Sequence, residues 1–156
     1  MSVVIINRQR TKKINLRLLK QITQVLLAEL KINGAEFGIN LVAAREMTLI
    51  NETFLKHTGS TDVITFDYAD KATETILAGE LFICVDDAIS QAKQFKTNWQ
   101  SEIIRYVIHG VLHLLGHDDH RVAEHKKMKR EENRLVRVLS KKFSLAQIGG
   151  HSKLRK

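Results

Sequence analysis

The segment HGVLHLLGHDDH, residues 109–120, contains histidine and aspartate residues at spacings that suit a metal ion. His109 and His113 are four residues apart, so on a helix their side chains would lie on one face, about 6 Å apart. Two neutral imidazoles placed in this way can bind one cation, and histidine is a common ligand of zinc. The alternative, two core histidines satisfied by hydrogen bonds alone, is less favoured because burying unpaired imidazoles is costly.

A third ligand must come from the residues after these histidines. His117 continues the four-residue spacing, but the helix rises about 12 Å over the eight residues from His109, which is beyond the reach of one ion. Gly116 allows the chain to turn back toward the histidines. The candidates beyond this turn are Asp118, Asp119 and His120. Because a catalytic zinc site has three protein ligands and an open fourth position, we expect one zinc ion per chain.

The elements that must position these residues follow from the hydrophobic spacing. Residues 99–115 form the most apolar predicted helix, which we expect to be central and largely buried, and Gly116 suits its end. We expect Asp86 to cap a helix. Thr61 and Asp62 precede a strand, where they either orient the site or start the strand, and the strand start is the favoured interpretation. The other predicted helices are 14–31, 45–55, 86–95 and 122–143, and the predicted strands are 37–43, 62–66 and 79–85. The pattern predicts an α+β fold, with a small mixed sheet of about four strands and helices around the central helix.

The composition is that of a soluble globular domain. The chain has 156 residues, of which 44% are hydrophobic and 27% are charged, and we expect residues 1–156 to form one metallohydrolase domain with a basic, disordered tail from about residue 145. The apolar run at residues 3–6 is too short for a signal peptide, and no stretch is long enough to span a membrane. Cys84 is the only cysteine, which excludes an intrachain disulfide and favours a cytoplasmic location.

The net charge of +8 is unevenly distributed. Residues 1–20 carry basic but no acidic side chains, residues 121–156 are strongly basic, and the middle of the chain is acidic. Two basic ends suggest a polyanionic partner, with nucleic acid as the first candidate. The candidate contacts are Lys126, Lys127 and Lys129. A solvated basic surface without a partner is the alternative.

Three segments resemble the YbeY family of bacterial endoribonucleases. HGVLHLLGHDD is similar to the signature His-Gly-x-Leu-His-Leu-x-Gly-Tyr-Asp-His, INETFLKHTGSTDVITF (50–66) resembles a second family segment, and GELFICVDDAISQA (79–92) resembles a third. The likeness extends from about residue 37 to 139. It implies a zinc-dependent hydrolase of single-stranded RNA that matures the 3′ end of small-subunit rRNA and helps to clear defective ribosomes. It implies the small ribosomal subunit as a partner, and neither a membrane nor a small-molecule cofactor.

The chain departs from the family pattern at functional positions. The family's third histidine falls at position 119, so we predict Asp119 as the third ligand and keep His120 as the alternative. A family arginine that is a candidate for holding a phosphate corresponds to Leu55. Lys56 and His57 are the candidates to replace it as catalytic residues, and an ordinary polar helix end is the alternative.

The predicted catalytic group is therefore His109, His113 and Asp119, with zinc-bound water acting as nucleophile or as base for the RNA 2′-hydroxyl. A zinc peptidase similar to the metzincins is one alternative, but Gly110 replaces the general-base glutamate of the His-Glu-x-x-His motif. A non-catalytic ribosome-associated protein is another, and its structural zinc would require a fourth ligand from this chain. Two histidines and one carboxylate also suit non-haem iron, although nothing indicates an oxygenase substrate.

Overall fold

The structure, a computed structural model, describes residues 2–68 and 77–150. Its four strands form one sheet in the order β1-β2-β4-β3. The strands are β1 (Ser2–Asn7), β2 (Ala35–Val42), β3 (Val63–Asp67) and β4 (Leu77–Cys84). β1, β2 and β4 run parallel, and β3 pairs antiparallel with β4 at one edge. The predicted α+β class with a mixed sheet of four strands is confirmed.

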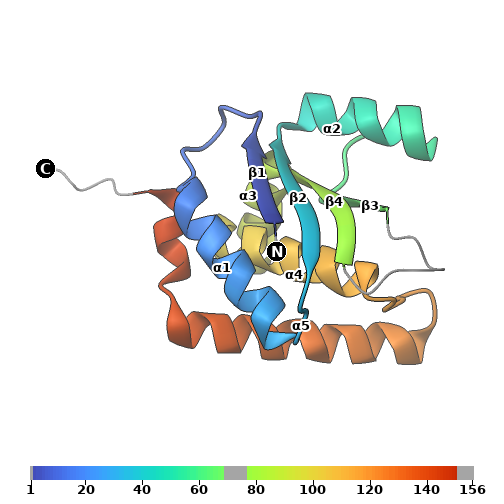
Figure 1. Ribbon diagram of the computed structural model, residues 1–156. Helices are drawn as coiled ribbons and strands as arrows, with labels where there is room; N and C mark the ends of the chain where they lie inside the picture. Colours follow the sequence, from blue (N-terminus) through green and yellow to red (C-terminus); the bar gives the residue numbers. More distant parts are fainter. Residues whose placement is uncertain (1, 69–76, 151–156) are drawn as a thin grey trace, which may run out of the picture.

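Helices lie on both sides of this sheet. They are α1 (Leu16–Glu29), α2 (Ala44–Ile50), α3 (Val85–Phe95), α4 (Trp99–Leu114) and α5 (Val122–Lys142). A π-helical turn, η1 (Asn51–Leu55), extends α2, and a 3-10 helix, η2 (Leu145–Gly149), follows α5. Figure 1 shows α2 and α5 at opposite ends of the molecule, with the sheet between them. Within the described ranges, no helix combines the length and apolarity needed to cross a membrane.

The main core lies between one face of the sheet and helices α1, α3, α4 and α5. Side chains alternate along a strand, so Leu81 and Ile83 of β4 point into this core and are fully buried. α4 contacts the sheet, α3 and α5, and Ile103, Ile108 and Val111 have no exposed surface. The predicted central buried helix is confirmed.

A smaller core occupies the other face of the sheet, under α2. It contains Val42, Met47, Ile50, Ile64 and Cys84. Burial raises the pKa of the Cys84 thiol to about 12, so this cysteine is a neutral packing residue.

Two local features differ from the sequence-based expectations. β1 is not among the predicted strands, because apolar side chains on both of its faces hide the alternation typical of a strand. Its outward-facing Val4 and Ile6 are half exposed. Asp86 does not cap its own helix: α3 begins at Val85, and the Asp86 carboxylate accepts a hydrogen bond at 2.6 Å from the backbone N–H of Ala44 in the first turn of α2. Asp86 therefore connects the two helices.

The disordered tail was predicted to start at about residue 145, and this start is too early in the sequence. Leu145 and Ile148 of η2 are buried in the main core, and the Ile148 carbonyl accepts a hydrogen bond from the backbone N–H of Asn15. Residues 145–149 are thus part of the folded domain. The remainder of the predicted tail, residues 151–156, lies outside the described residues.

Candidate metal centre

α4 presents His109 and His113 on one side, as the four-residue spacing predicts. The helix starts at the N-cap Asn98, whose side chain accepts a hydrogen bond from the backbone N–H of Ser101 at 2.8 Å. The Nε2 atoms of the two histidines are 3.1 Å apart. Both side chains are partly exposed, so they can be reached from solvent while their helix remains buried.

The other ring nitrogen of each histidine has a partner that accepts hydrogen bonds. His109 Nδ1 lies 2.5 Å from Oε2 of Glu132, and His113 Nδ1 lies 3.0 Å from the carbonyl oxygen of His117. A carbonyl and an ionised carboxylate can only accept, so each Nδ1 carries the proton and each Nε2 has a lone pair. Two lone pairs at 3.1 Å repel each other unless a proton or a metal cation lies between them.

The chain after α4 turns back through Gly116. Gly116 has a φ of +100°, its N–H donates to the His113 carbonyl, and the N–H of His117 donates to the Leu112 carbonyl. These two bonds form a Schellman motif, in which glycine suits the left-handed position. The same turn aims the His117 carbonyl at His113 Nδ1, so the main chain of His117, and not its imidazole, supports the site.

The turn brings Asp119 to the histidines and leaves His120 outside. Asp119 Oδ2 is 3.8 Å from His113 Nε2, and ligand atoms of His109, His113 and Asp119 all lie within 4.8 Å of one another. The His120 side chain is 87% exposed and contacts Asp118 instead. The structure therefore gives Asp119 the position of a third ligand, while its binding of metal stays a prediction.

These side chains fit a zinc ion. Two nitrogen lone pairs 3.1 Å apart are compatible with bonds of about 2.0–2.1 Å to one ion, and a carboxylate oxygen completes a common ligand set. A metal-bound histidine usually donates its second N–H to a carboxylate or carbonyl, and both partners are present here. Within the described ranges, no fourth side chain joins this group of candidate ligands.

Sequence reasoning missed Glu132, which is 4% exposed. A signal for it was present in the helical spacing of α5. Met128, Glu132, Leu135 and Leu139 are the buried residues of that helix, and they follow one another at intervals of three or four residues. A carboxylate within an otherwise apolar stripe requires a partner, and Glu132 has two on α4: His109 and Arg105, whose Nη1 lies 3.6 Å from Oε1 of Glu132.

The carboxylates around the site alter the pKa of the His109 imidazole. Burial alone would lower the pKa of His109, but the hydrogen bond and charge of Glu132, together with the charges of Asp62 and Asp119, outweigh it and raise the pKa. Without a metal, the site thus favours a positive charge at the position that a cation would occupy. Burial raises the pKa of Tyr106 well above its usual range, which keeps this phenol neutral.

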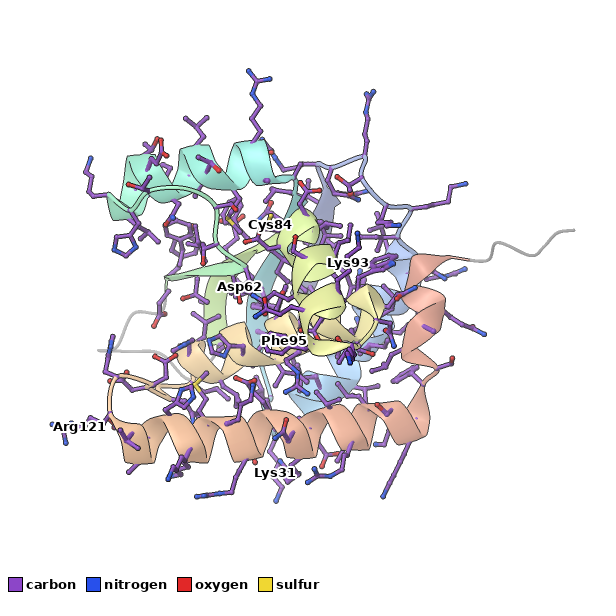
Figure 2. All side chains as sticks on the ribbon, turned by 180° about the vertical axis from the view of Figure 1, so that it is seen from behind. Lys31, Asp62, Cys84, Lys93, Phe95 and Arg121 are labelled. Carbon is purple, nitrogen blue, oxygen red and sulfur yellow. The ribbon has the colours of Figure 1, made fainter. Side chains whose placement is uncertain are left out.

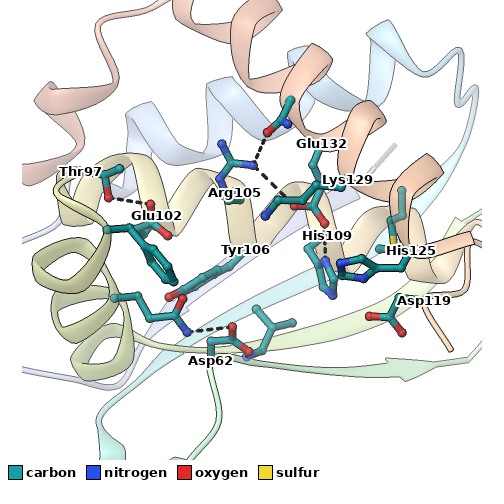
Figure 3. Close-up of a pocket in the computed structure, with 15 residues that line it drawn as sticks. Asp62, Thr97, Glu102, Arg105, Tyr106, His109, Asp119, His125, Lys129 and Glu132 are labelled. Atoms are coloured by element: carbon teal, nitrogen blue, oxygen red, sulfur yellow. Dashed lines mark hydrogen bonds and ion pairs between the residues drawn. The ribbon is translucent and has the colours of Figure 1, made fainter. Parts of the chain in front are cut away.

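A pocket of about 340 Å³ opens beside the candidate metal centre. It lies over α4, between α3, α5 and the start of β3, and Figure 3 shows His109 and Asp119 at one end and Thr97 and Glu102 at the other. Its lining residues include Arg105, Lys129 and His125. In Figure 2, the lining residues Asp62 and Phe95 lie on the side of the molecule where α3 faces the viewer.

Asp62 lies at the start of β3 and also lines the pocket. Its Oδ1 accepts a hydrogen bond from the N–H of Val63 at 2.8 Å, as expected of a residue at a strand start. Its Oδ2 accepts from Nε2 of Gln91 at 3.3 Å, and both residues line the pocket. Its position is therefore compatible with both interpretations, a strand-start residue and a residue that orients the site.

The structure does not bring every predicted site residue to this pocket. Lys56 ends η1 with a φ of +60°, and Lys56 and His57 are exposed and are not among the pocket residues. Lys129 lines the pocket. Lys127 lines a second depression next to Gly116, and Lys126 is exposed on α5.

Comparisons with known proteins agree with the fold and the motif. Residues 4–140 match the family model described as Endoribonuclease YbeY. An Endoribonuclease YbeY of Chlorobium phaeovibrioides is 33% identical over 78% of this chain and 80% of that protein. One of Myxococcus xanthus is 36% identical over 77% of this chain but only 42% of its own length. A Thermotoga maritima protein solved in solution superposes with a TM-score of 0.68 at 22% identity, covering 99% of each chain, which supports the fold. The chain belongs to the endoribonuclease YbeY family.

Proposed function

We propose that this protein is a zinc-dependent endoribonuclease that binds one zinc ion per chain at His109, His113 and Asp119. The observation that carries the proposal is the pair of Nε2 atoms, which lie 3.1 Å apart beside a carboxylate at the end of a pocket. Membership of the endoribonuclease YbeY family supports RNA as the substrate.

The residues around the site suit phosphodiester hydrolysis. When bound, zinc lowers the pKa of a water molecule to near 7, which provides a nucleophile or a base at neutral pH. Glu132 accepts from His109 Nδ1–H and so keeps the Nε2 lone pair available. His125 and Lys129 reach the same end of the pocket from α5 (Figure 3). Lys129 would bind the phosphate as a point charge. It would thereby take the place of the family arginine, which is Leu55 in this chain.

The substrate we propose is single-stranded RNA, and its biological setting is the maturation of the 3′ end of small-subunit rRNA and ribosome quality control in the cytoplasm. The net charge of +8 supports a polyanionic partner. Reversing the charge of the exposed Lys126 and Lys127 should lower RNA affinity and flatten its salt dependence while leaving zinc content unchanged. An affinity that is already independent of salt in the wild type would contradict this role of α5.

The two alternative functions are less well supported. A Cβ at Gly110, the general-base position of His-Glu-x-x-His peptidases, would lie 2.7 Å from Cδ1 of the fully buried Leu81. The fold therefore opposes any side chain there. A structural zinc site requires four protein ligands, whereas the described residues offer three beside a pocket.

The test is cleavage of an end-labelled single-stranded RNA by protein of known zinc content. Zinc-loaded wild type should cut it, and metal-stripped protein should cut only after zinc is restored. His113→Ala should lose zinc and cleavage together, whereas His120→Ala should keep both. Cleavage at the rate of the zinc-loaded wild type, either by stripped protein or by His113→Ala, would reject the proposal. A 2′,3′-cyclic phosphate product would indicate attack by the 2′-hydroxyl, and a linear phosphate would indicate attack by water.

A further inference from the structure

The end of the pocket away from the metal centre contains a carboxylate that the proposed chemistry does not use. Glu102 is 6% exposed, and its Oε2 accepts a hydrogen bond from the Thr97 hydroxyl at 2.8 Å. Its Oε1 has no hydrogen-bond partner in the described part of the chain. A carboxylate can accept several hydrogen bonds, and Glu102 lines the pocket. The open oxygen of Glu102 is therefore a place where a ligand can donate.

The position of Glu102 relative to the metal centre fits a nucleotide. Glu102 and His109 are seven residues apart on α4, which corresponds to about 10 Å along the helix. A phosphate at the metal end would thus place an attached nucleoside toward Glu102. Figure 3 shows Tyr106 between the two ends. The pocket volume of about 340 Å³ is within the range of small-molecule sites.

The remaining lining residues suit a nucleobase. Phe95 lies at the end of α3, lines the pocket and is 60% exposed, so its ring is available for stacking. Proteins that recognise single-stranded RNA stack bases on aromatic side chains and read their edges by hydrogen bonds. Gln91 and Arg105 also line the pocket. Gln91 donates to Asp62 and Arg105 to Asn133, and each side chain has further N–H groups that can donate to a base carbonyl.

We propose that this pocket binds a guanine base of the RNA next to the scissile phosphate, with Glu102 accepting from the Watson–Crick edge. Guanine presents two neighbouring N–H donors, N1–H and N2–H, which match the two oxygens of one carboxylate. Uracil has one N–H between two carbonyls that a carboxylate repels, and in adenine and cytosine a ring-nitrogen lone pair adjoins the amino group. The inference rests on the proposed function only in taking RNA as the natural ligand.

The experiment measures binding of the four nucleoside 5′-monophosphates to the zinc-loaded protein by calorimetry. GMP should bind wild type about tenfold more tightly than UMP, since a bidentate contact to a base edge discriminates by roughly 5- to 150-fold. Glu102→Gln should reduce the preference to within about twofold. Glu36→Gln, which removes an exposed carboxylate outside the pocket, should leave it unchanged. Phe95→Ala should weaken all four nucleotides while keeping guanine favoured. Zinc content and thermal unfolding of each variant establish that it is folded.

Equal affinity of GMP and UMP for the wild type, or a preference that survives in Glu102→Gln, would overturn the proposal. A second measurement uses a set of short RNAs, each with one guanine at a different position. Their cleavage distinguishes failure of the guanine site from failure of the proposed nuclease function. If these RNAs are cut regardless of where the guanine lies, the proposed nuclease function stands and the guanine site is excluded. If the preference for GMP depends on Glu102 but no RNA is cut, the guanine site stands and the proposed nuclease function is excluded.

Discussion

The candidate metal centre has a helical part, the two histidines of α4, and a loop part, Asp119, and the protein fixes these two parts to different extents. His109 and His113 lie on α4, whose neighbouring Ile108 and Val111 are fully buried, and each imidazole has a hydrogen-bond partner for its Nδ1. Asp119 lies after the Gly116 turn, and its side chain is 33% exposed. In the described residues its carboxylate has no hydrogen-bond partner, since His113 is 3.8 Å away. We infer that the two histidines are arranged before metal binds and that Asp119 is fixed when it binds.

The largest expected effect comes from removing either helical ligand. His109→Ala and His113→Ala should each weaken zinc binding by more than about 100-fold, because losing a ligand exceeds the 10- to 100-fold effect of losing its outer partner. The measurement is competition with a chelator of known affinity at neutral pH. Full zinc occupancy in both variants would exclude the helical half of the site.

Asp119→Ala should weaken zinc binding by about 100-fold, less than either histidine variant, because two arranged imidazoles remain and the exposed carboxylate must be ordered when the metal binds. His120→Ala is the matched control on the same turn and should change the affinity by less than about twofold, since this side chain points to solvent. If His120→Ala loses zinc and Asp119→Ala keeps it, the turn is one residue longer than the structure has it.

Glu132→Gln tests whether the helical part depends on its outer partner. The amide oxygen can still accept from His109 Nδ1–H, but it carries no charge, so zinc affinity should fall by about tenfold. Glu131→Gln is the control, because Glu131 is the adjacent residue and pairs with the exposed Arg134. Similar zinc affinities for the two variants would show that Glu132 serves only to pack α5 against α4.

The last comparison concerns stability instead of zinc affinity: the glycines on either side of His113, Gly110 and Gly116, should affect the free energy of unfolding by urea. Gly110→Ala should cost about 1–3 kcal/mol because its Cβ would overlap buried Leu81. Gly116→Ala has open space around it, and its cost of about 1 kcal/mol should come from the positive φ. In combination with Leu81→Ala, Gly110→Ala should cost less than in the wild type. Additive costs would contradict the packing explanation.

The same contrast explains how much the sequence predicted. The four-residue histidine spacing and the glycine turn are local, so the helix, the turn and the position of Asp119 could be predicted from neighbouring residues. Glu132 is 23 residues from His109, and its role depends on how α5 packs on α4. The pocket residues Asp62 and Glu102 likewise come together only through the tertiary fold.

The fold shows the same limit. Most helices and strands follow from hydrophobic spacing, but β1 and the packing of η2 do not. β1 is apolar on both faces, and η2 is a short segment in a basic region that is buried through Leu145 and Ile148. Lys56 and His57 were candidates because of their side-chain chemistry, and the sequence does not reveal that η1 extends α2 away from the pocket.

A crystal structure of the zinc-loaded protein, with anomalous scattering recorded at the zinc edge, tests the central claim most directly. We expect one zinc peak per chain at about 2.0–2.2 Å from Nε2 of His109, Nε2 of His113 and a carboxylate oxygen of Asp119. A water should occupy the fourth position, on the side of the pocket. A zinc ion closed by a fourth side chain of this protein, or bound through His120 in place of Asp119, would contradict the account.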